Sequence, residues 1–440
     1  MPGPFDKMVC LVGENPLPVY LGIKQLATPE AEVVLVYSEA TKPQAQNIKA
    51  LLDKVRVTNG NGERTCITNQ VVQLCDPYCP RQVRETLDAV VARLNHPQNY
   101  ALNYTGGTKV MSDYGLLAWM LMQQAPHRQE RSTGLAWPEV KNAFYLEEPS
   151  GKFHFHDDEV PLIVAPTLEE LLALHGVERL PERPAPDASQ ADIEKMFGWY
   201  DDGSQRNVFN EVQHAVKWRQ ELHTQKSKQQ YHWLWPQFDR ALGSWQQDCS
   251  WWKLLSLITN DTAQRWLDDP ALPDNPEAYQ GSLLEARLRF IVHGLWFELW
   301  VRDILRKIHG PQQEIVMGAE MTIDGQRFES DVMTIIGHRL FYFSVTTASA
   351  EGVCKEKMFE AMHRARQIGG GLAYSCVVSL ADYPYYGGEK QDTVQNCRLS
   401  IGKAPYHTMF GKAHVRQWRR GSYNSLARFL QGIHRLEDRL

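Results

Sequence analysis

The sequence has no long apolar run, few cysteines and no excess of positive charge. No stretch approaches the ~20 apolar residues that a membrane-spanning helix needs. The N-terminus lacks the charged, apolar and small-residue segments of an export signal. The eight cysteines among 440 residues are scattered, so we expect reduced thiols in a cytoplasmic protein with no membrane association. The formal net charge of −5 predicts no general affinity for nucleic acid.

Several familiar catalytic and metal-binding patterns are missing as well. The sequence contains neither a Walker A motif nor a GxSxG elbow. Cys75 and Cys79 lie close together, but no second Cys or His pair follows at zinc-like spacing. His154 to Glu159 holds metal-like residues at a strand end, where alternate side chains share a face by default. The first segment therefore favours a loop over a metal site, and the second favours the end of a hairpin.

An alternation of apolar strands and amphipathic helices opens the chain. This pattern predicts an α/β fold with a parallel sheet covered by helices on both faces. In such sheets ligands bind beyond the carboxyl ends of the strands. The expected strands are residues 7–13, 32–38, 71–76 and 100–104, and the expected helices are 18–26, 42–55 and 80–94.

Three loops follow these strands at the expected ligand-binding edge, at residues 13–18, 38–42 and 105–109. The third reads Thr-Gly-Gly-Thr-Lys and leads into an apolar helix. Glycines allow a backbone to approach a ligand closely, and the first N–H groups of a helix attract anions. Lys109 adds a positive charge. The residues alone therefore predict a site for a phosphate or a nucleotide.

The remainder of the chain divides by composition. Residues 181–190 are rich in proline and predict a linker, and residues 191–276 look helical and rich in tryptophan. That aromatic segment fits a helical bundle or a base-stacking surface. From residue 281 a helix ending at Gly310, two or three antiparallel strands, a second helix and a further strand predict a separate α/β domain. The tail from residue 403 predicts a strand and one final helix, with basic residues that suit a nucleic-acid backbone or a solvated face.

With these residues in view, the N-terminal segment resembles a CRISPR-associated Rossmann-fold (CARF) domain. The resemblance rests on GENPLP, YSEAT and above all NYTGGTKVMS, and it covers about the first 175 residues. It implies a Rossmann-like domain that dimerises and binds a cyclic oligoadenylate, usually cyclic tetra-adenylate, the second messenger of type III CRISPR systems. The ligand-binding residues that it implies are Asn15, Pro16, Leu17, Ser38, Thr41, Thr105, Gly106, Gly107, Thr108 and Lys109.

The C-terminal segment resembles a PD-(D/E)xK restriction-endonuclease-like domain, of the kind joined to CARF domains in CARF nucleases. GLWFE offers Glu298 on a helix, and FESDVM offers Asp331 on a strand. The resemblance implies that these carboxylates and the Val345 carbonyl hold Mg²⁺ or Mn²⁺, with Ser344 as a further catalytic oxygen. Glu329, on the same strand face as Asp331, is a spare carboxylate.

The third part of the nuclease pattern, an acid and a lysine two residues apart, is missing. The strand reads FYFSVTT, so Ser344 and Thr346 stand at those positions, and a threonine cannot replace an ammonium group. In one reading a lysine near the start of the next helix, Lys355 or Lys357, supplies the cation, and we include Lys355 in the expected catalytic set. In the other reading the domain is inactive and binds nucleic acid or a protein partner.

We therefore expect a CARF domain over residues 1–180, a linker and helical connector over 181–280, and a nuclease-like domain over 281–440. Binding of the activator to a homodimer would trigger metal-dependent cleavage of DNA, RNA or both in type III CRISPR defence. The alternative is a ligand-gated regulator whose nuclease domain is inactive. The ring size of the activator, the polynucleotide cut and the fate of the activator stay open at this stage.

Overall fold

The computed structural model divides the chain into two compact units. The first unit comprises Met1–Leu180, Glu314–Ser344 and Ser349–Leu440, and the second comprises Pro181–Gln313 and Val345–Ala348. Most of the predicted linker and the predicted helical connector beyond Asp201 lie outside the described residues. The structure describes residues 4–54, 56–58, 64–66, 68–74, 76–92, 99–124, 142–147, 150–180, 189–201, 294–381, 385–386, 389–390, 393–400 and 406–431.

The first unit contains a seven-stranded sheet built from the N-terminal segment. Its strands are β1 (Phe5–Leu11), β2 (Ala27–Ser38), β5 (Thr68–Leu74), β6 (Tyr100–Asn103), β7 (Ala143–Glu147), β8 (Lys152–His154) and β9 (Glu159–Pro161). Its order is β5-β2-β1-β6-β7-β8-β9. The pairs from β5 to β7 are parallel, which confirms the parallel sheet that the sequence predicts, and β7, β8 and β9 pair antiparallel. A short hairpin of β3 (Arg56–Thr58) and β4 (Arg64–Cys66) forms a separate ladder.

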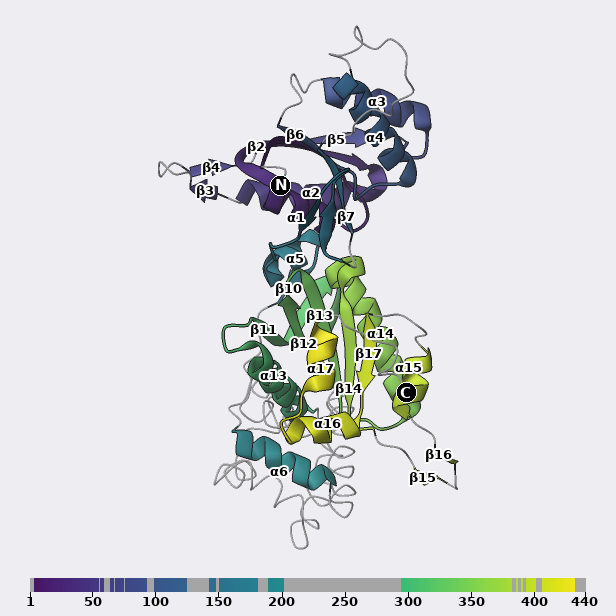
Figure 1. Cartoon of the computed structure of the whole chain (residues 1–440). Helices are drawn as coiled ribbons and strands as arrows, with labels where there is room; N and C mark the ends of the chain where they lie inside the picture. Colours follow the sequence, from purple (N-terminus) through teal and green to yellow (C-terminus); the bar gives the residue numbers. More distant parts are fainter. Residues whose placement is uncertain are drawn as a thin grey trace, which may run out of the picture. The chain divides into compact units, whose positions relative to one another are not determined.

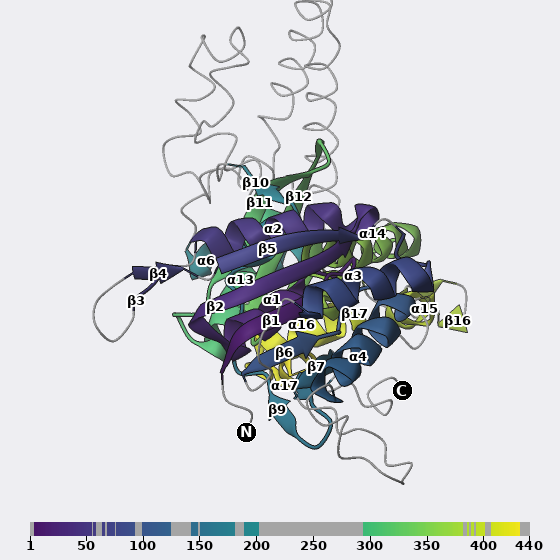
Figure 2. The same ribbon diagram turned by 90° about the horizontal axis from the view of Figure 1, so that it is seen from above.

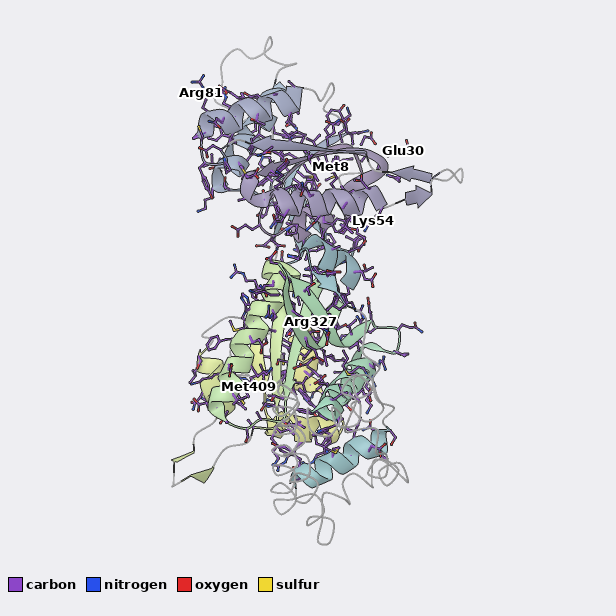
Figure 3. All side chains as sticks on the ribbon, turned by 180° about the vertical axis from the view of Figure 1, so that it is seen from behind. Met8, Glu30, Lys54, Arg81, Arg327 and Met409 are labelled. Atoms are coloured by element: carbon purple, nitrogen blue, oxygen red, sulfur yellow. The ribbon has the colours of Figure 1, made fainter. Side chains whose placement is uncertain are left out.

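Both faces of this sheet are buried, because alternate residues of one strand enter two different hydrophobic clusters. Met8 and Cys10 of β1 belong to one cluster, and Val9 and Leu11 belong to the other. Helices α1, α2 and α5 contribute to the first cluster, and α3 and α4 contribute to the second, on the opposite face (Figures 1 and 2). The helix bounds are α1 (Leu17–Leu26), α2 (Lys42–Lys54), α3 (Pro80–Ala92), α4 (Lys109–Gln124) and α5 (Leu168–Leu174). Figure 3 marks Met8, which is fully buried within this sheet.

The first unit also contains most of a second, six-stranded sheet, in the order β10-β11-β12-β13-β14-β17. Its strands are β10 (Glu178–Arg179), β11 (Ile315–Ile323), β12 (Gln326–Ile336), β13 (Arg339–Thr346), β14 (Tyr374–Ser379) and β17 (His407–Phe410). The remaining elements of this part are α14 (Glu351–Gly369), β15 (Tyr385–Tyr386), β16 (Glu389–Lys390), α15 (Thr393–Ser400), α16 (Lys412–Arg419) and α17 (Asn424–Leu430). The antiparallel strands and their turns at Asp324-Gly325 and Gly337-His338 confirm the sequence prediction.

Helices cover the two faces of this second sheet. Met333 and Tyr342 share a hydrophobic cluster with Met358 and Ala361 of α14. The neighbouring residue Phe341 faces the other way, and its ring lies 5.6 Å from that of Phe429 in α17. The alternation of side chains along β13 thus separates an α14 face from an α17 face.

The prediction of a single final helix in the tail is wrong. Two helices, α16 and α17, follow β17, and the chain turns between them at Gly421, whose φ is +82°. A positive φ is a conformation that glycine adopts at little cost, so this residue ends the first helix.

The second unit contains α6 (Gln190–Asp201) and α13 (Leu295–His309) among its described residues. Phe197 packs edge-on against Trp296 and Trp300, with ring centroids 4.9 Å apart in both pairs. The Tyr200 hydroxyl donates to the Thr347 carbonyl at 2.6 Å. Aromatic packing therefore holds α6 against α13, and α13 ends at Gly310 as predicted. No helix in the described part of the chain is long and apolar enough to cross a bilayer.

Candidate functional site

The carboxyl ends of β1, β2 and β6 meet at one edge of the first sheet, because these strands are parallel neighbours. The three predicted loops follow them, and α4 begins at Lys109 directly after the Thr-Gly-Gly-Thr turn. Lys109 is exposed, and its ammonium forms no hydrogen bond or ion pair with the described residues. A helix N-terminus and a solvent-facing cation therefore lie together at this edge.

Two of these loops lie backbone against backbone, and glycine makes this possible. A β-carbon on Gly106 would collide with the Leu11 carbonyl oxygen and lie 2.6 Å from the Gly13 nitrogen. A β-carbon on Gly13 would lie 2.8 Å from the Gly107 nitrogen. Gly107 itself has φ of +84°. The sequence prediction assigned Gly106 and Gly107 to the ligand, and it missed Gly13 and this packing role.

The threonine hydroxyls of the third loop already have protein partners. The Thr105 hydroxyl donates to Asn103 Oδ1 at 2.7 Å and accepts from the Leu146 amide at 2.8 Å. The Thr108 hydroxyl donates to the Pro77 carbonyl at 2.9 Å and accepts from the Met111 amide at 3.2 Å. Thr108 thus caps α4, and both side chains hold the loop in shape.

Ser38 and Thr41 also bind each other. The Thr41 hydroxyl accepts from the Ser38 amide at 3.1 Å, and the two hydroxyl oxygens are 3.3 Å apart. Both residues are buried. They fix the turn after β2 and leave little surface for a ligand.

The first loop presents one of its three predicted residues. Pro16 and Leu17 are buried, whereas Asn15 is half-buried and its Oδ1 accepts from the Leu17 amide at 3.2 Å. The Asn15 side chain also lies against Gly370, where a β-carbon would be 2.5 Å from Asn15 Oδ1. Asn15 therefore connects the loop of the first sheet with the turn that ends α14.

An aromatic residue that the sequence prediction missed lies beside this edge. Tyr78 is 72% exposed in the loop after β5, next to Pro77, which Thr108 binds. Its backbone is held by an Asx turn, because the Tyr78 amide donates to Asp76 Oδ1 at 2.9 Å. The Pro and Asp around Tyr78 signalled a turn, but only the fold brings this loop against Thr108, the residue before Lys109.

In the second sheet, Asp331 and Ser344 form a cross-strand pair. The Ser344 hydroxyl donates to Asp331 Oδ2 at 3.2 Å, from β13 to β12. Ser344 is buried and Asp331 is half-buried, so the carboxylate keeps access to solvent. Two predicted catalytic residues are therefore adjacent.

The two candidate lysines of α14 differ in their surroundings. Lys355 forms an ion pair with Glu351 at 2.7 Å, which raises the pKa of Lys355 through the hydrogen bond. Burial lowers the pKa of Lys357, but the charges of Asp331 and Glu360 outweigh it, so the net shift is upward. Of the two lysines, only Lys357 has a pKa that the Asp331 charge raises.

Thr346, at the position of the missing lysine, forms a hydrogen bond with the backbone through its side chain. Its hydroxyl accepts from the Ala348 amide at 3.1 Å and closes the end of β13. Val345 is buried, and Glu298 is half-buried in the first turn of α13. Val345 and Glu298 belong to the second unit, whereas Asp331 and Ser344 belong to the first.

The predicted metal ligands provide only some of the oxygen atoms that Mg²⁺ or Mn²⁺ needs. Among the described residues no three His, Cys, Asp or Glu side chains gather closely enough to hold a metal ion. Mg²⁺ often binds through one or two carboxylates and several waters, and Asp331 can provide one of them.

No protein-family model matches this sequence, and no curated protein sequence matches it. The structure of Can2 from Sulfobacillus thermosulfidooxidans in complex with cyclic tetra-adenylate superposes with a TM-score of 0.54 at 18% identity, covering 97% of each chain. Protein VC1899 from Vibrio cholerae superposes with a TM-score of 0.57 at 12% identity, covering 97% of this chain and 98% of that chain. This chain therefore shares the fold of these two proteins over nearly its whole length.

Proposed function

We propose that this chain is a homodimeric effector of type III CRISPR defence that senses a cyclic oligoadenylate and responds through its C-terminal domain. The observation that carries the proposal is the meeting of the α4 N-terminus, the exposed Lys109 and the loop after β1 at one sheet edge. The fold shared with Can2, whose structure contains cyclic tetra-adenylate, supports that ligand class.

The ligand roles divide among the edge residues. The N–H groups at the start of α4 and the Lys109 ammonium would hold phosphates, and Asn15 would hydrogen-bond ribose or base. The exposed ring of Tyr78 would stack on an adenine. Ser38, Thr41, Thr105 and Thr108 would act indirectly, because their hydroxyls hold the loops.

Calorimetry with cyclic tetra-adenylate tests this site. We expect saturable binding by the intact chain and at least tenfold weaker binding by Lys109→Gln. Lys49→Gln is the matched control, because Lys49 is an exposed lysine of α2 paired with Asp53. Absence of binding heat with every adenylate ring size would reject the sensor proposal.

The output that we propose is metal-dependent cleavage of DNA or RNA. Asp331 would provide one ligand of Mg²⁺ or Mn²⁺, and the resemblance to the nuclease pattern implies Glu298 and the Val345 carbonyl as the others. The metal, when bound, would activate water and neutralise phosphate charge. Ser344 orients the Asp331 carboxylate through its hydrogen bond. Lys357, rather than Lys355, would supply the cation that β13 lacks.

Cleavage of plasmid and single-stranded substrates in Mn²⁺, with and without activator, tests this output. We expect Asp331→Ala to abolish the stimulated cleavage and Glu329→Gln, two residues earlier on the strand, to retain it. Equal activity of Asp331→Ala and the intact protein would exclude the site.

One observation favours a second candidate, a ligand-gated binding protein with an inactive nuclease domain. Thr346 stands where the nuclease pattern has lysine, and its hydroxyl is engaged by the Ala348 amide. This candidate predicts that activator-loaded protein retards labelled DNA or RNA without cutting it. Thr346→Lys is the comparison, since a gain of cleavage in this variant would identify the missing ammonium as the cause.

A further inference from the structure

Every charged side chain from residue 393 to residue 436 is basic, although the whole chain carries a formal charge of −5. The described part of this segment contains β17, α16 and α17. Exposed arginines occur on both helices and in the turn between them, at Arg416, Arg419, Arg420 and Arg428. The segment itself contains no acidic residue.

The apolar sides of these helices are fixed to the sheet. Val415 and Trp418 of α16 are each 1% exposed, and the Trp418 ring lies 5.0 Å from that of Phe410 in β17. Trp418 Nε1 also donates to Ser425 Oγ in α17 at 3.1 Å. The arginines therefore project from a rigid support.

Helix stability explains only part of this pattern. Basic residues in the last turn of a helix interact favourably with its dipole, which accounts for Arg416, Arg419 and Arg428. The helix dipole does not explain Arg420, which lies in the turn beyond the end of α16. It also does not explain why the whole segment contains no acidic residue.

The basic helix begins at the sheet edge that carries the Asp331–Ser344 pair. β14 and β17 are parallel, and α16 starts two residues after β17 ends. β13 and β14 are sheet neighbours joined through α14, and such a helical crossover makes them parallel. Ser344 near the end of β13 and Lys412 at the start of α16 thus share one edge.

We propose that α16, together with Arg420 and Arg428, is a binding surface for the phosphodiester backbone of a nucleic acid. On a helix, residues three and four apart are neighbours about 5–6 Å apart, so Arg416, Arg419 and Arg420 form one group. Such a group neutralises successive phosphates of a strand and contributes affinity independent of sequence. The surface holds the strand beside the carboxylate site, and this last step rests on the proposed function.

An anionic membrane is a less suitable partner. The described residues of β17, α16 and α17 expose no large apolar side chain. Helices that lie on membranes insert such side chains between the lipids.

Fluorescence anisotropy with labelled single- and double-stranded oligonucleotides tests the surface, using the full chain in EDTA without activator. We expect Arg419→Gln/Arg420→Gln to raise Kd at least tenfold. The steepness of log K against log salt should fall by about 1.5, because each of the two lost phosphate contacts contributes ~0.7–0.9 to the slope. The matched control is Arg81→Gln/Arg84→Gln on the exposed side of α3, where Figure 3 marks Arg81, and it should change Kd less than twofold.

Equal effects of the two double variants, or an unchanged salt slope, would overturn the proposal. So would an intact chain that binds neither oligonucleotide, with or without cyclic tetra-adenylate, or one that binds only anionic vesicles. The main measurement contains neither metal nor activator. Its result therefore stays valid even if the chain does not sense a cyclic oligoadenylate or does not cleave nucleic acid. Unchanged thermal unfolding of the variants confirms that they fold.

Discussion

At the scale of single residues, Gly106 and Gly13 bring the loops after β6 and β1 into backbone contact. Neither position has room for a β-carbon, because the nearest atoms belong to the opposing backbone. Backbone atoms cannot move aside as a flexible side chain can. The shape of the candidate ligand edge therefore depends on two missing methyl groups.

We expect Gly106→Ala to lower the free energy of unfolding by ~1–3 kcal/mol, because the added methyl group overpacks the loop contact. Urea unfolding measures the change. Gly198→Ala is the control, since no described atom beyond its own stretch of helix lies within 4 Å of the added β-carbon, and alanine within α6 should stabilise by ~0.5–1 kcal/mol. Similar effects of the two variants would contradict the packing argument.

The lysines of α14 give a second prediction at this scale. Lys357→Met should lower activator-stimulated kcat at least 100-fold if the domain is a nuclease, because it removes the α14 cation whose pKa the Asp331 charge raises. Lys355→Met should change kcat less than threefold, because Lys355 pairs with Glu351 instead. Steady-state cleavage assays of both variants decide between them, and a larger loss in Lys355→Met would reverse the assignment.

The sequence predicted the candidate edge more successfully than the role of each residue in it. The Thr-Gly-Gly-Thr-Lys pattern predicted a turn before a helix, and α4 begins where expected. The hydroxyl partners could not be predicted, because Thr105 binds Leu146, 41 residues away, and Thr108 binds Pro77, 31 residues away. Contacts at such separations depend on the fold and not on local pattern.

At the scale of elements, hydrophobic periodicity located most of the strands and helices of both sheets. β1 and β2 read as continuous apolar runs because both of their faces are buried. The split between α16 and α17 was missed, because a glycine within a helical pattern does not by itself reveal a positive φ. β10 was missed as well, since a two-residue strand carries no periodicity.

Helix α5 gives a prediction about pH. His175 follows α5, and its Nε2 is buried without a hydrogen-bond partner among the described residues. Burial lowers the pKa of His175 to about 4. The unfolded chain takes up this proton near pH ~6.5, so the free energy of unfolding falls as the pH falls from ~6.5 towards ~4, by ~3 kcal/mol.

Urea unfolding of the intact protein and of His175→Gln at several pH values measures this contribution. As the pH falls, the intact protein should lose more of its free energy of unfolding than His175→Gln does. The variant should therefore become more stable relative to the intact protein. Parallel pH profiles of the two proteins would show that His175 is protonated equally in both states.

At the scale of the whole molecule, a cyclic ligand with two-fold symmetry suits a two-fold dimer. We expect light scattering to give a dimer, and calorimetry to give one ring per two chains. Tyr78→Ala should weaken binding about tenfold without changing this ratio, because stacking on a base contributes ~1–3 kcal/mol. A monomer that binds one ring per chain would contradict the symmetric arrangement.

The N-terminal segment that builds the first sheet also supplies the border strand β10 of the second sheet. After α5, the chain forms β10, which pairs with β11 through Glu178–Thr322 and Arg179–Met321, and the Leu180 amide donates to the Glu320 carbonyl at 2.8 Å. A fragment or chimera joined after residue 180 would lose this border strand and leave the N–H and C=O groups of β11 unprotected. Such a protein should self-associate through that edge, so a graft that replaces the first sheet and keeps β11 must place its junction before Glu178 and retain the short strand beside its neighbour.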